Sequence, residues 1–132
     1  MILADTSAWI EYLRRTDTSV CQRMTELVEH PVTVATTQIV IMEVLSGARG
    51  EDDVRVLRDL LLRCELAPVD AMEDYERAAM LYRICRGNGA TIRSMIDCLV
   101  AAVAIRTGAR VLHADRDYDV LARHTALRLE TV

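Results

Sequence analysis

The sequence predicts an α/β domain built around a parallel sheet. Short apolar and β-branched runs recur along the chain, and they alternate with longer segments whose apolar residues recur at helical spacing. Strands that alternate with helices in this way are typical of parallel sheets, in which a helix joins each strand to the next. The length of 132 residues suffices for one adequate core, so we expect a single domain over residues 1–132.

The expected elements follow from apolar spacing and from capping residues. Strands are predicted at residues 2–4, 32–35, 66–69, 110–113 and 127–129, and Pro68 indicates that the third strand lies at an edge. Helices are predicted at residues 7–15, 19–29, 38–46, 52–64, 71–86 and 95–107, with a short one after the turn at residues 114–117. The expected capping residues are Ser7, Thr36 or Thr37, Asp70 with Glu73, and Ser94 at the starts, and Gly47 and Gly108 at the ends.

Composition excludes several classes of protein. Apolar residues make up 52% of the chain, which is typical of a folded domain and not of a disordered one. No apolar run reaches the roughly 18 residues that cross a bilayer, and the first residues lack the basic segment of a signal peptide. We therefore expect a cytoplasmic protein without a membrane partner.

The cysteines and histidines do not have the spacing of a metal site. The four cysteines contain no C-x-x-C pair, so we expect reduced, mostly buried thiols. The three histidines show no ligand spacing either. Oxygen atoms must then hold any bound metal.

The charge of the chain leaves its partner undecided. A formal net charge of −4 argues mildly against a nucleic-acid partner. All 16 basic residues are arginines, whose forked side chains suit phosphate. A compositional bias of the source genome explains the absence of lysine as well.

Two acidic residues are expected at the carboxyl ends of strands, where parallel sheets bind their ligands. Asp5 directly follows the first strand, and Asp115 closely follows the fourth. Both would face the same crevice. A helix cap accounts for Asp5 equally well, and a turn accounts for Asp115.

Two further acidic residues lie in apolar helices. Glu43 lies in a helix that is apolar on nearly every side, which predicts that it is buried. It has no basic residue three or four positions away to neutralise it, so the carboxylate would be unpaired unless it reaches solvent or a distant arginine. Asp97 lies in the first turn of the helix at residues 95–107. A capping box with Ser94 or an ion pair with Arg93 explains this position as well as a functional role does.

Taken together, these acidic residues predict a metal site. Clustered carboxylates repel each other unless they are protonated or bind a divalent cation, and Asp117 adds a fifth acid beside Asp115. A site made only of oxygen ligands suits Mg²⁺ or Mn²⁺ rather than Zn²⁺. Such ions orient phosphate groups and activate water.

Four short segments carry these acids, in the order Ile2-Leu3-Ala4-Asp5-Thr6-Ser7, Glu43-Val44-Leu45-x-Gly47, Asp97-x-x-Val100-Ala101-Ala102 and Asp115-Arg116-Asp117-Tyr118. In this order and spacing the chain resembles the PIN-domain nucleases over its whole length, and it is most similar to the VapC-type toxins of toxin–antitoxin pairs. One departure is Ala114, where many relatives have Thr or Ser. A polar contact that would support Asp115 is therefore missing.

The resemblance implies a three-layer α/β/α fold with a central parallel sheet of about five strands. It also implies metal-dependent endonucleolytic cleavage of RNA. With Mg²⁺, or Mn²⁺ as a substitute, activating the attacking water, the products would carry 5′-phosphate and 3′-hydroxyl ends. The implied partners are a second copy of the chain and a small antitoxin, whose tail enters the active-site groove of a hetero-oligomer.

Carried over residue by residue, Asp5 and Asp97 would be the principal metal ligands. Glu43 and Asp115 would complete the catalytic quartet, Asp117 is a further candidate ligand, and Thr6 or Ser7 would supply a supporting hydroxyl. Arginines near the groove would attract RNA, although a solvated surface role fits each of them too; they are Arg14, Arg15, Arg93 and Arg116. The candidates for contact with an amphipathic partner segment are Trp9, Ile10 and Leu13.

Two other functions compete with this one. A catalytically inactive PIN-fold module for binding or dimerisation has the same fold, although a pure scaffold has no need for four uncompensated acids. A carboxylate-based Mg²⁺ phosphotransfer domain also places acids at strand ends. Phosphatases of this type need Asp-x-Asp after the first strand, where this chain has Asp5-Thr6-Ser7, and receiver domains need a lysine that the chain lacks.

Overall fold

The computed structural model describes residues 1–132, apart from the side chain of Val32. Five strands form one sheet in the order β3-β2-β1-β4-β5, and every neighbouring pair is parallel. The strands are β1 (Ile2–Ala4), β2 (Val34–Thr36), β3 (Glu65–Leu66), β4 (Arg110–Leu112) and β5 (Arg128–Leu129). The predicted parallel α/β fold is confirmed, and β3 lies at an edge as Pro68 indicated.

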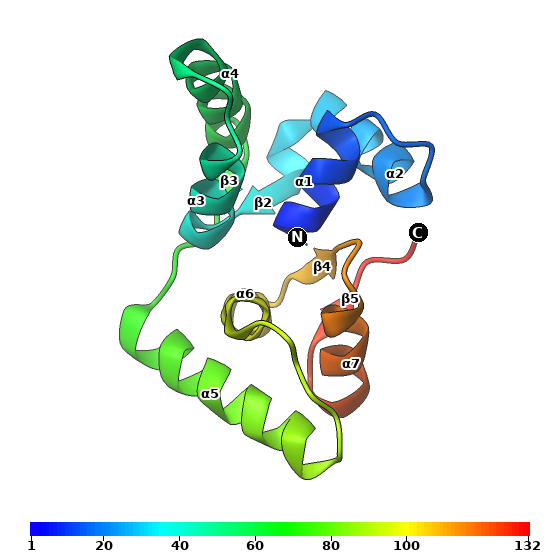
Figure 1. Ribbon diagram of the computed structural model, residues 1–132, viewed down its shortest axis with the longest axis vertical. Coiled ribbons are helices and arrows are strands. Elements are labelled where there is room, and N and C mark those ends of the chain that lie inside the picture. The colour runs from blue at the N-terminus through cyan, green and yellow to red at the C-terminus, as the bar shows by residue number, and fades with distance from the viewer.

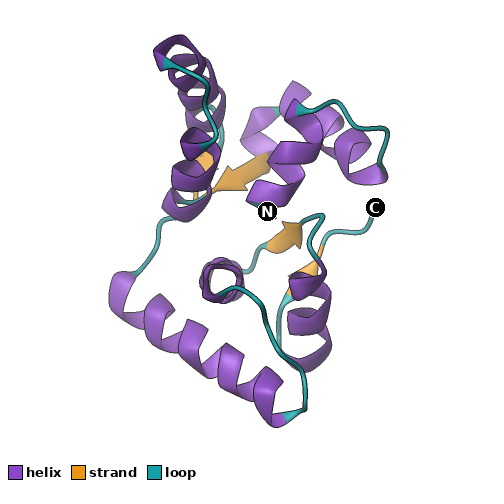
Figure 2. Ribbon diagram, in the orientation of Figure 1, coloured by secondary structure: helices purple, strands orange, loops and turns teal.

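Helices cover the sheet on both sides (Figures 1 and 2). One side carries α1 (Thr6–Leu13) and α2 (Ser19–Glu29), and the other carries α5 (Ala71–Gly87), α6 (Met95–Thr107) and α7 (Arg116–His124) (Figure 1). The pair α3 (Gln38–Ser46) and α4 (Glu51–Leu62) stands beside the β3 edge (Figure 1). Within the described chain, every helix is too short or too polar to cross a membrane.

Helix α6 is the most enclosed helix of the fold. Residues 97–104 are all buried, because the helix packs against α3, α5, α7 and β4. A helix that is apolar on all sides is stable only when neighbours surround it in this way. Gly108 ends the helix in a left-handed conformation (φ 72°), as predicted.

The starts of two helices depend on aspartates. Helix α1 begins one residue earlier than predicted, because Asp5 and not Ser7 is the N-cap and accepts the Ser7 N–H. Asp115 caps α7 by accepting the Asp117 N–H. A carboxylate oxygen can satisfy an unpaired N–H at a helix start as well as a hydroxyl does. The cap and turn explanations for these two acids are therefore correct, and any further role must be compatible with them.

Two strands are shorter than predicted because prolines precede or follow them. Pro31 opens a single 3₁₀ turn, η1 (Pro31–Thr33), and β2 begins only at Val34. Strand β3 ends at Leu66. Ala67 still donates its N–H to the Thr36 carbonyl at 2.8 Å, but Pro68 has no N–H with which to continue the ladder.

Helix α5 is tied at its first turn to α6. Asp70 caps it by accepting the Glu73 N–H, as predicted, but the return bond runs from the Asp70 N–H to Asp74 (2.8 Å) and not to Glu73. Asp74 is fully buried and pairs with Arg106 through two 2.9 Å hydrogen bonds. Burial of this carboxylate is tolerated because the charged guanidinium binds it in a bidentate way.

The four cysteines are free and buried, as expected.

Candidate active site

The acidic residues meet at the carboxyl ends of β1 and β4. Ala4 lies opposite Leu112 in the parallel register. The segments that follow β1 and β4 therefore leave the sheet side by side. The Asp5 N–H still donates to the Leu112 carbonyl at 2.9 Å. Asp115 follows β4 at the start of α7, and the first turn of α6 brings Asp97 to the same place.

Three carboxylates form a compact cluster at this edge. One oxygen from each of Asp97, Asp115 and Asp117 lies within 4.8 Å of the others. Asp97 and Asp117 are buried, and Asp115 is half-buried. Carboxylates held this close in a poorly hydrated place repel each other, and a divalent cation would relieve that repulsion.

Asp97 is the least compensated member of the cluster. Its Oδ2 is buried and has no hydrogen-bond partner among the residues that the structure describes. Burial, and then the charge of Asp5 and the contact with Asp117, raise the pKa of Asp97 to about 8. A carboxylate oxygen that is buried, unpartnered and surrounded by other acids fits a cation ligand.

Neither structural explanation for Asp97 holds. The Ser94 side chain makes no capping hydrogen bond, so no capping box forms at the start of α6. Arg93 turns its guanidinium to Asp115 and Asp117, and not to Asp97. The sequence offered both partners within four residues, but the tertiary structure directs one of them elsewhere.

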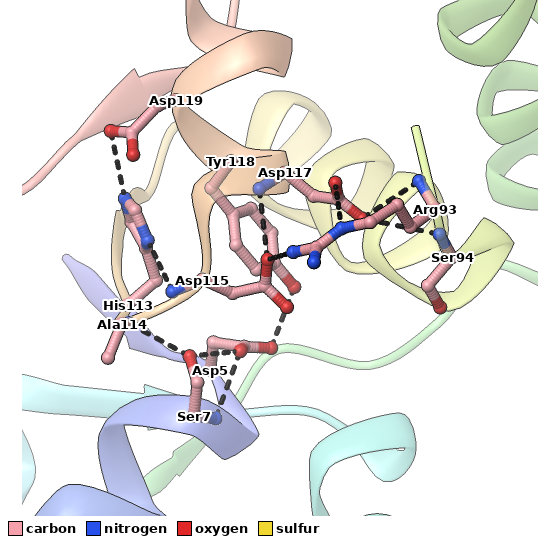
Figure 3. A network of polar contacts seen from close by, with 10 residues as sticks. All are labelled: Asp5, Ser7, Arg93, Ser94, His113, Ala114, Asp115, Asp117, Tyr118 and Asp119. Atoms are coloured by element: carbon pink, nitrogen blue, oxygen red, sulfur yellow. Dashed lines mark hydrogen bonds and ion pairs between the residues drawn. The ribbon is translucent and has the colours of Figure 1, made fainter. Parts of the chain in front are cut away.

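Asp5 has both oxygens oriented by donors (Figure 3). The Tyr118 hydroxyl donates to Oδ1 at 2.7 Å. Oδ2 accepts the Ser7 N–H at 3.0 Å and the Ser7 hydroxyl at 2.6 Å. The Ser7 oxygen in turn accepts the Ala114 N–H at 2.9 Å. The backbone of Ala114 thus supplies a polar contact at the position where its side chain has none.

Tyr118 is a site residue that sequence analysis missed. It belonged to the family motif, but no role was predicted for it. The available signal was its hydroxyl, because a tyrosine buried in a core usually needs a hydrogen-bond partner. That signal could not be used from the sequence, because the short, strongly charged helix that contains Tyr118 gives no sign that the residue is buried.

Asp117 is engaged by the loop before α6. Its Oδ2 accepts the N–H groups of Arg93 (3.0 Å) and Ser94 (3.2 Å), and its Oδ1 accepts Arg93 Nε at 3.3 Å. The other end of the guanidinium donates to Asp115 Oδ1 at 3.0 Å (Figure 3). Asp117 therefore fixes the start of the helix that presents Asp97.

Glu43 is half-buried, and the prediction that it is buried is wrong. Its carboxylate accepts the Thr6 hydroxyl at 2.7 Å, so Thr6 is the polar partner that its own helix lacks. The side chain reaches a groove of about 510 Å³ between α1, α3 and α4, which explains its exposure. The groove is lined by Thr6, Ile10, Leu13, Arg14, Glu43, Val44, Gly47, Arg49, Asp53 and Leu57.

The predicted substrate-binding arginines are not gathered in one place. Arg14 lines the groove, Arg93 lies in the acidic cluster, and Arg15 and Arg116 are exposed. Arg49 also lines the groove, and sequence analysis missed it. No local pattern marks Arg49, because the groove forms only when α3 and α4 pack beside α1.

His113 is held at the rim of the site. Its Nδ1 accepts the Asp115 N–H at 3.1 Å, and its Nε2 lies 3.6 Å from Asp119. The ring packs against Tyr118 with 5.2 Å between centroids. With both nitrogens directed at protein groups, His113 helps to position Asp115 and does not face the acidic cluster.

This arrangement defines a class of α/β domain in which a parallel sheet presents clustered carboxylates at its carboxyl edge. The chain belongs to the PIN-domain family, whose model matches residues 2–124. It is 43% identical over 129 residues to a Mycobacterium tuberculosis protein called ribonuclease VapC11, with 97% of this chain and 96% of the relative covered. Ribonuclease VapC51 of the same organism is 31% identical, with 93% and 86% covered.

Solved structures share the fold at lower sequence identity. The crystal structure of VapBC2 from Rickettsia felis, bound to a DNA fragment from their promoter, has a TM-score of 0.73 and 20% identity, with 98% of each chain covered. The FitAB structure bound to an IR36 DNA fragment gives a TM-score of 0.74 at 20% identity, with 98% of this chain and 94% of that chain covered. The predicted family and the three-layer α/β/α fold are confirmed.

Proposed function

We propose that this chain is a Mg²⁺-dependent endoribonuclease and the toxin of a toxin–antitoxin pair. The observation that carries the proposal is the unpartnered, buried oxygen of Asp97 beside two other carboxylates. The ribonuclease VapC relatives, one of them 43% identical over nearly the whole chain, support RNA as the substrate. Single-domain organisation over residues 1–132 and a cytoplasmic location belong to the same proposal.

Asp5, Asp97 and Asp115 would hold the cation, and Mn²⁺ would substitute for Mg²⁺. The bound ion would stabilise negative charge on the scissile phosphate and lower the pKa of a water molecule. Glu43 would position water or a second ion from the groove side, where Thr6 already orients its carboxylate. Asp117 accepts hydrogen bonds from Arg93 and Ser94 at the start of α6, so it would position that helix in addition to the ligand role predicted for it.

RNA cleavage with and without metal tests this proposal. Protein treated with EDTA should not cleave RNA, and added Mg²⁺ or Mn²⁺ should restore cleavage. Asp97→Asn should remain inactive in Mg²⁺, whereas the exposed Asp59→Asn on α4 should cleave normally as a matched control. A metal-loaded protein that binds RNA or a partner without cleaving any RNA would support the inactive binding module instead.

The groove beside Glu43 suits the apolar side of an antitoxin segment. Ile10 and Leu13 are exposed there, and Arg14 and Arg49 flank them. The prediction that Trp9 contacts a partner is wrong, because Trp9 is fully buried and packs in the core. A segment lying in this groove would also reach Glu43, which would couple antitoxin binding to inhibition.

Co-purification and light scattering test the proposed partners. We propose a homodimer that joins the antitoxin in a hetero-oligomer. Leu13→Asp should weaken retention of the co-expressed antitoxin, whereas Leu62→Asp, an exposed leucine outside the groove, should not. A strictly monomeric protein at micromolar concentration would refute the dimer and leave the chemistry intact.

A further inference from the structure

Arg93 lies inside the acidic cluster, at a place where a cation is expected. Its guanidinium spans Asp117 Oδ1 (3.3 Å) and Asp115 Oδ1 (3.0 Å), as Figure 3 shows. Arginine keeps its charge at every pH in use. The guanidinium therefore neutralises part of the repulsion among the carboxylates in the absence of any metal.

The Arg93 side chain is free to leave without unfolding the loop that carries it. The side chain is 58% exposed, so solvent can accept the guanidinium. The loop itself is anchored by main-chain groups, because the N–H groups of Arg93 and Ser94 donate to Asp117 Oδ2 at 3.0 and 3.2 Å. Those two bonds do not depend on the side chain at position 93.

A divalent ion bound at Asp115 would oppose the pair that Arg93 forms with this carboxylate. The Oδ1 atom that accepts Arg93 also accepts the Asp117 N–H at 2.9 Å as part of the α7 cap. A cation held by Asp97 and Asp115 would also repel the positive charge of Arg93. Binding of the ion thus opposes the Arg93–Asp115 pair.

We propose that Arg93 is a built-in counter-cation that competes with the divalent ion for Asp115, so that ion binding displaces the guanidinium from that carboxylate. This inference rests on the proposed metal site and adds a regulatory element to it. Arg93 stabilises the metal-free fold and raises the metal concentration needed to fill the site. Arg93 is thus a regulator of metal binding, and the role goes beyond the RNA contact predicted for it.

Calorimetric titration with Mn²⁺ tests the competition without measuring cleavage. Arg93→Gln should bind Mn²⁺ about two- to fivefold more tightly than the unaltered protein, the range expected when an exposed ion pair no longer has to be broken. Arg93→Gln should also melt at a lower temperature without metal. The rise in Tm on adding Mn²⁺ should be larger in this variant, because the ion replaces the missing charge.

Two variants separate competition from other effects. Arg93→Lys keeps the charge but cannot bridge both carboxylates, so its Mn²⁺ affinity should lie between those of the unaltered protein and Arg93→Gln. Arg93→Lys also serves as the test variant if Arg93→Gln fails to fold. Arg116→Gln removes the same charge next to Asp115, but Arg116 forms no ion pair among the described residues. Its Mn²⁺ affinity should change less than that of Arg93→Gln.

Three results would overturn the inference. Unchanged or weaker Mn²⁺ binding by Arg93→Gln would mean that Arg93 does not compete with the ion. Equal tightening by Arg116→Gln would reveal a general charge effect. Absence of Mn²⁺ binding by the unaltered protein would refute the proposed metal site as well, whereas the first two results leave that site standing.

Discussion

The phenol of Tyr118 donates a 2.7 Å hydrogen bond to Oδ1 of Asp5, and this bond joins α7 to the end of the central strand β1. Tyr118 is fully buried. Burial and the charges of Asp5 and Asp97 raise the pKa of its phenol well above the usual value. The phenol therefore keeps its proton and always acts as the donor, so Asp5 is held in one orientation.

Tyr118→Phe should weaken metal binding without removing a ligand. The substitution keeps the ring in the core but leaves Asp5 Oδ1 without its donor, so the carboxylate is less well oriented. Loss of such a supporting contact costs about tenfold in metal affinity, and leaving a buried acceptor unpaired costs about 1–3 kcal/mol of stability. Titration with Mn²⁺ and urea unfolding measure the two effects.

Tyr82→Phe is the matched control for this substitution. Tyr82 is half-buried on α5, and its ring lies under the Arg86 guanidinium at 5.7 Å. Removing its hydroxyl should change neither measurement appreciably. If Tyr118→Phe bound Mn²⁺ as tightly as the unaltered protein, Asp5 would not depend on Tyr118 for its orientation.

Metal-free protein should lose stability as the pH rises from about 4 to about 8. The pKa of Asp97 is about 8 in the folded protein, against 3.8 for an ordinary aspartate. Between these values the folded state holds a proton that the unfolded state has released, so raising the pH favours unfolding. The loss ends above pH 8, where both states are ionised. Urea unfolding across this range measures it.

Asp97→Asn should flatten that pH dependence, because the amide cannot ionise. At pH 8 the metal-free variant should be more stable than the unaltered protein, since a repelling charge is gone. The variant should also lose most of the stabilisation by Mn²⁺. A pH dependence unchanged by Asp97→Asn would show that another group is responsible for it.

Asp117→Asn should destabilise the fold, in contrast to Asp97→Asn. An asparagine at this position loses the charge that Arg93 and two backbone N–H groups share. Hydrogen bonds to a charged group contribute about 1.5–3 kcal/mol, so we expect a loss of about 2 kcal/mol in urea unfolding. Asp119→Asn, on the exposed side of the same helix, should cost less than about 0.5 kcal/mol.

The ends of the cleaved RNA test the mechanism most directly. Attack by water leaves a 5′-phosphate and a 3′-hydroxyl, whereas attack by the 2′-hydroxyl with a general acid and base leaves a cyclic phosphate and a 5′-hydroxyl. His113 is occupied by Asp115 and Asp119 and does not supply that acid or base. Fragments should accept a ligase at the 5′ end without kinase treatment. Fragments with 5′-hydroxyl ends would refute water attack.

Local patterns determined most of the secondary structure. Short apolar runs and helix-period segments predicted five strands and the intervening helices, because burial in a two-sided sheet requires continuous apolar strands. The alternation of strands and helices also predicted the parallel pairing. The errors were one to three residues at the ends, where Asp5 replaced Ser7 as a cap and proline shortened the ladder.

The same patterns selected the acids but could not assign their partners. Asp5 and Asp115 followed strands, and parallel pairing alone brought them together at one edge. For Asp97 the sequence offered Ser94 and Arg93 as equally good neighbours. The tertiary structure excluded both: the packing of α6 against α7 places Arg93 within reach of Asp115 and Asp117, and the Ser94 side chain makes no capping bond, so Asp97 Oδ2 is left unpartnered.

By itself, therefore, the sequence determined the fold class, the family resemblance and the set of acids at one edge of the sheet. The tertiary structure alone decided that Tyr118 orients Asp5, that Thr6 supports Glu43, and that Arg93 lies among the carboxylates. The physical reason is distance along the chain. Propensity and periodicity act between near neighbours, whereas Tyr118 and Asp5 are 113 residues apart and meet only because β4 pairs with β1.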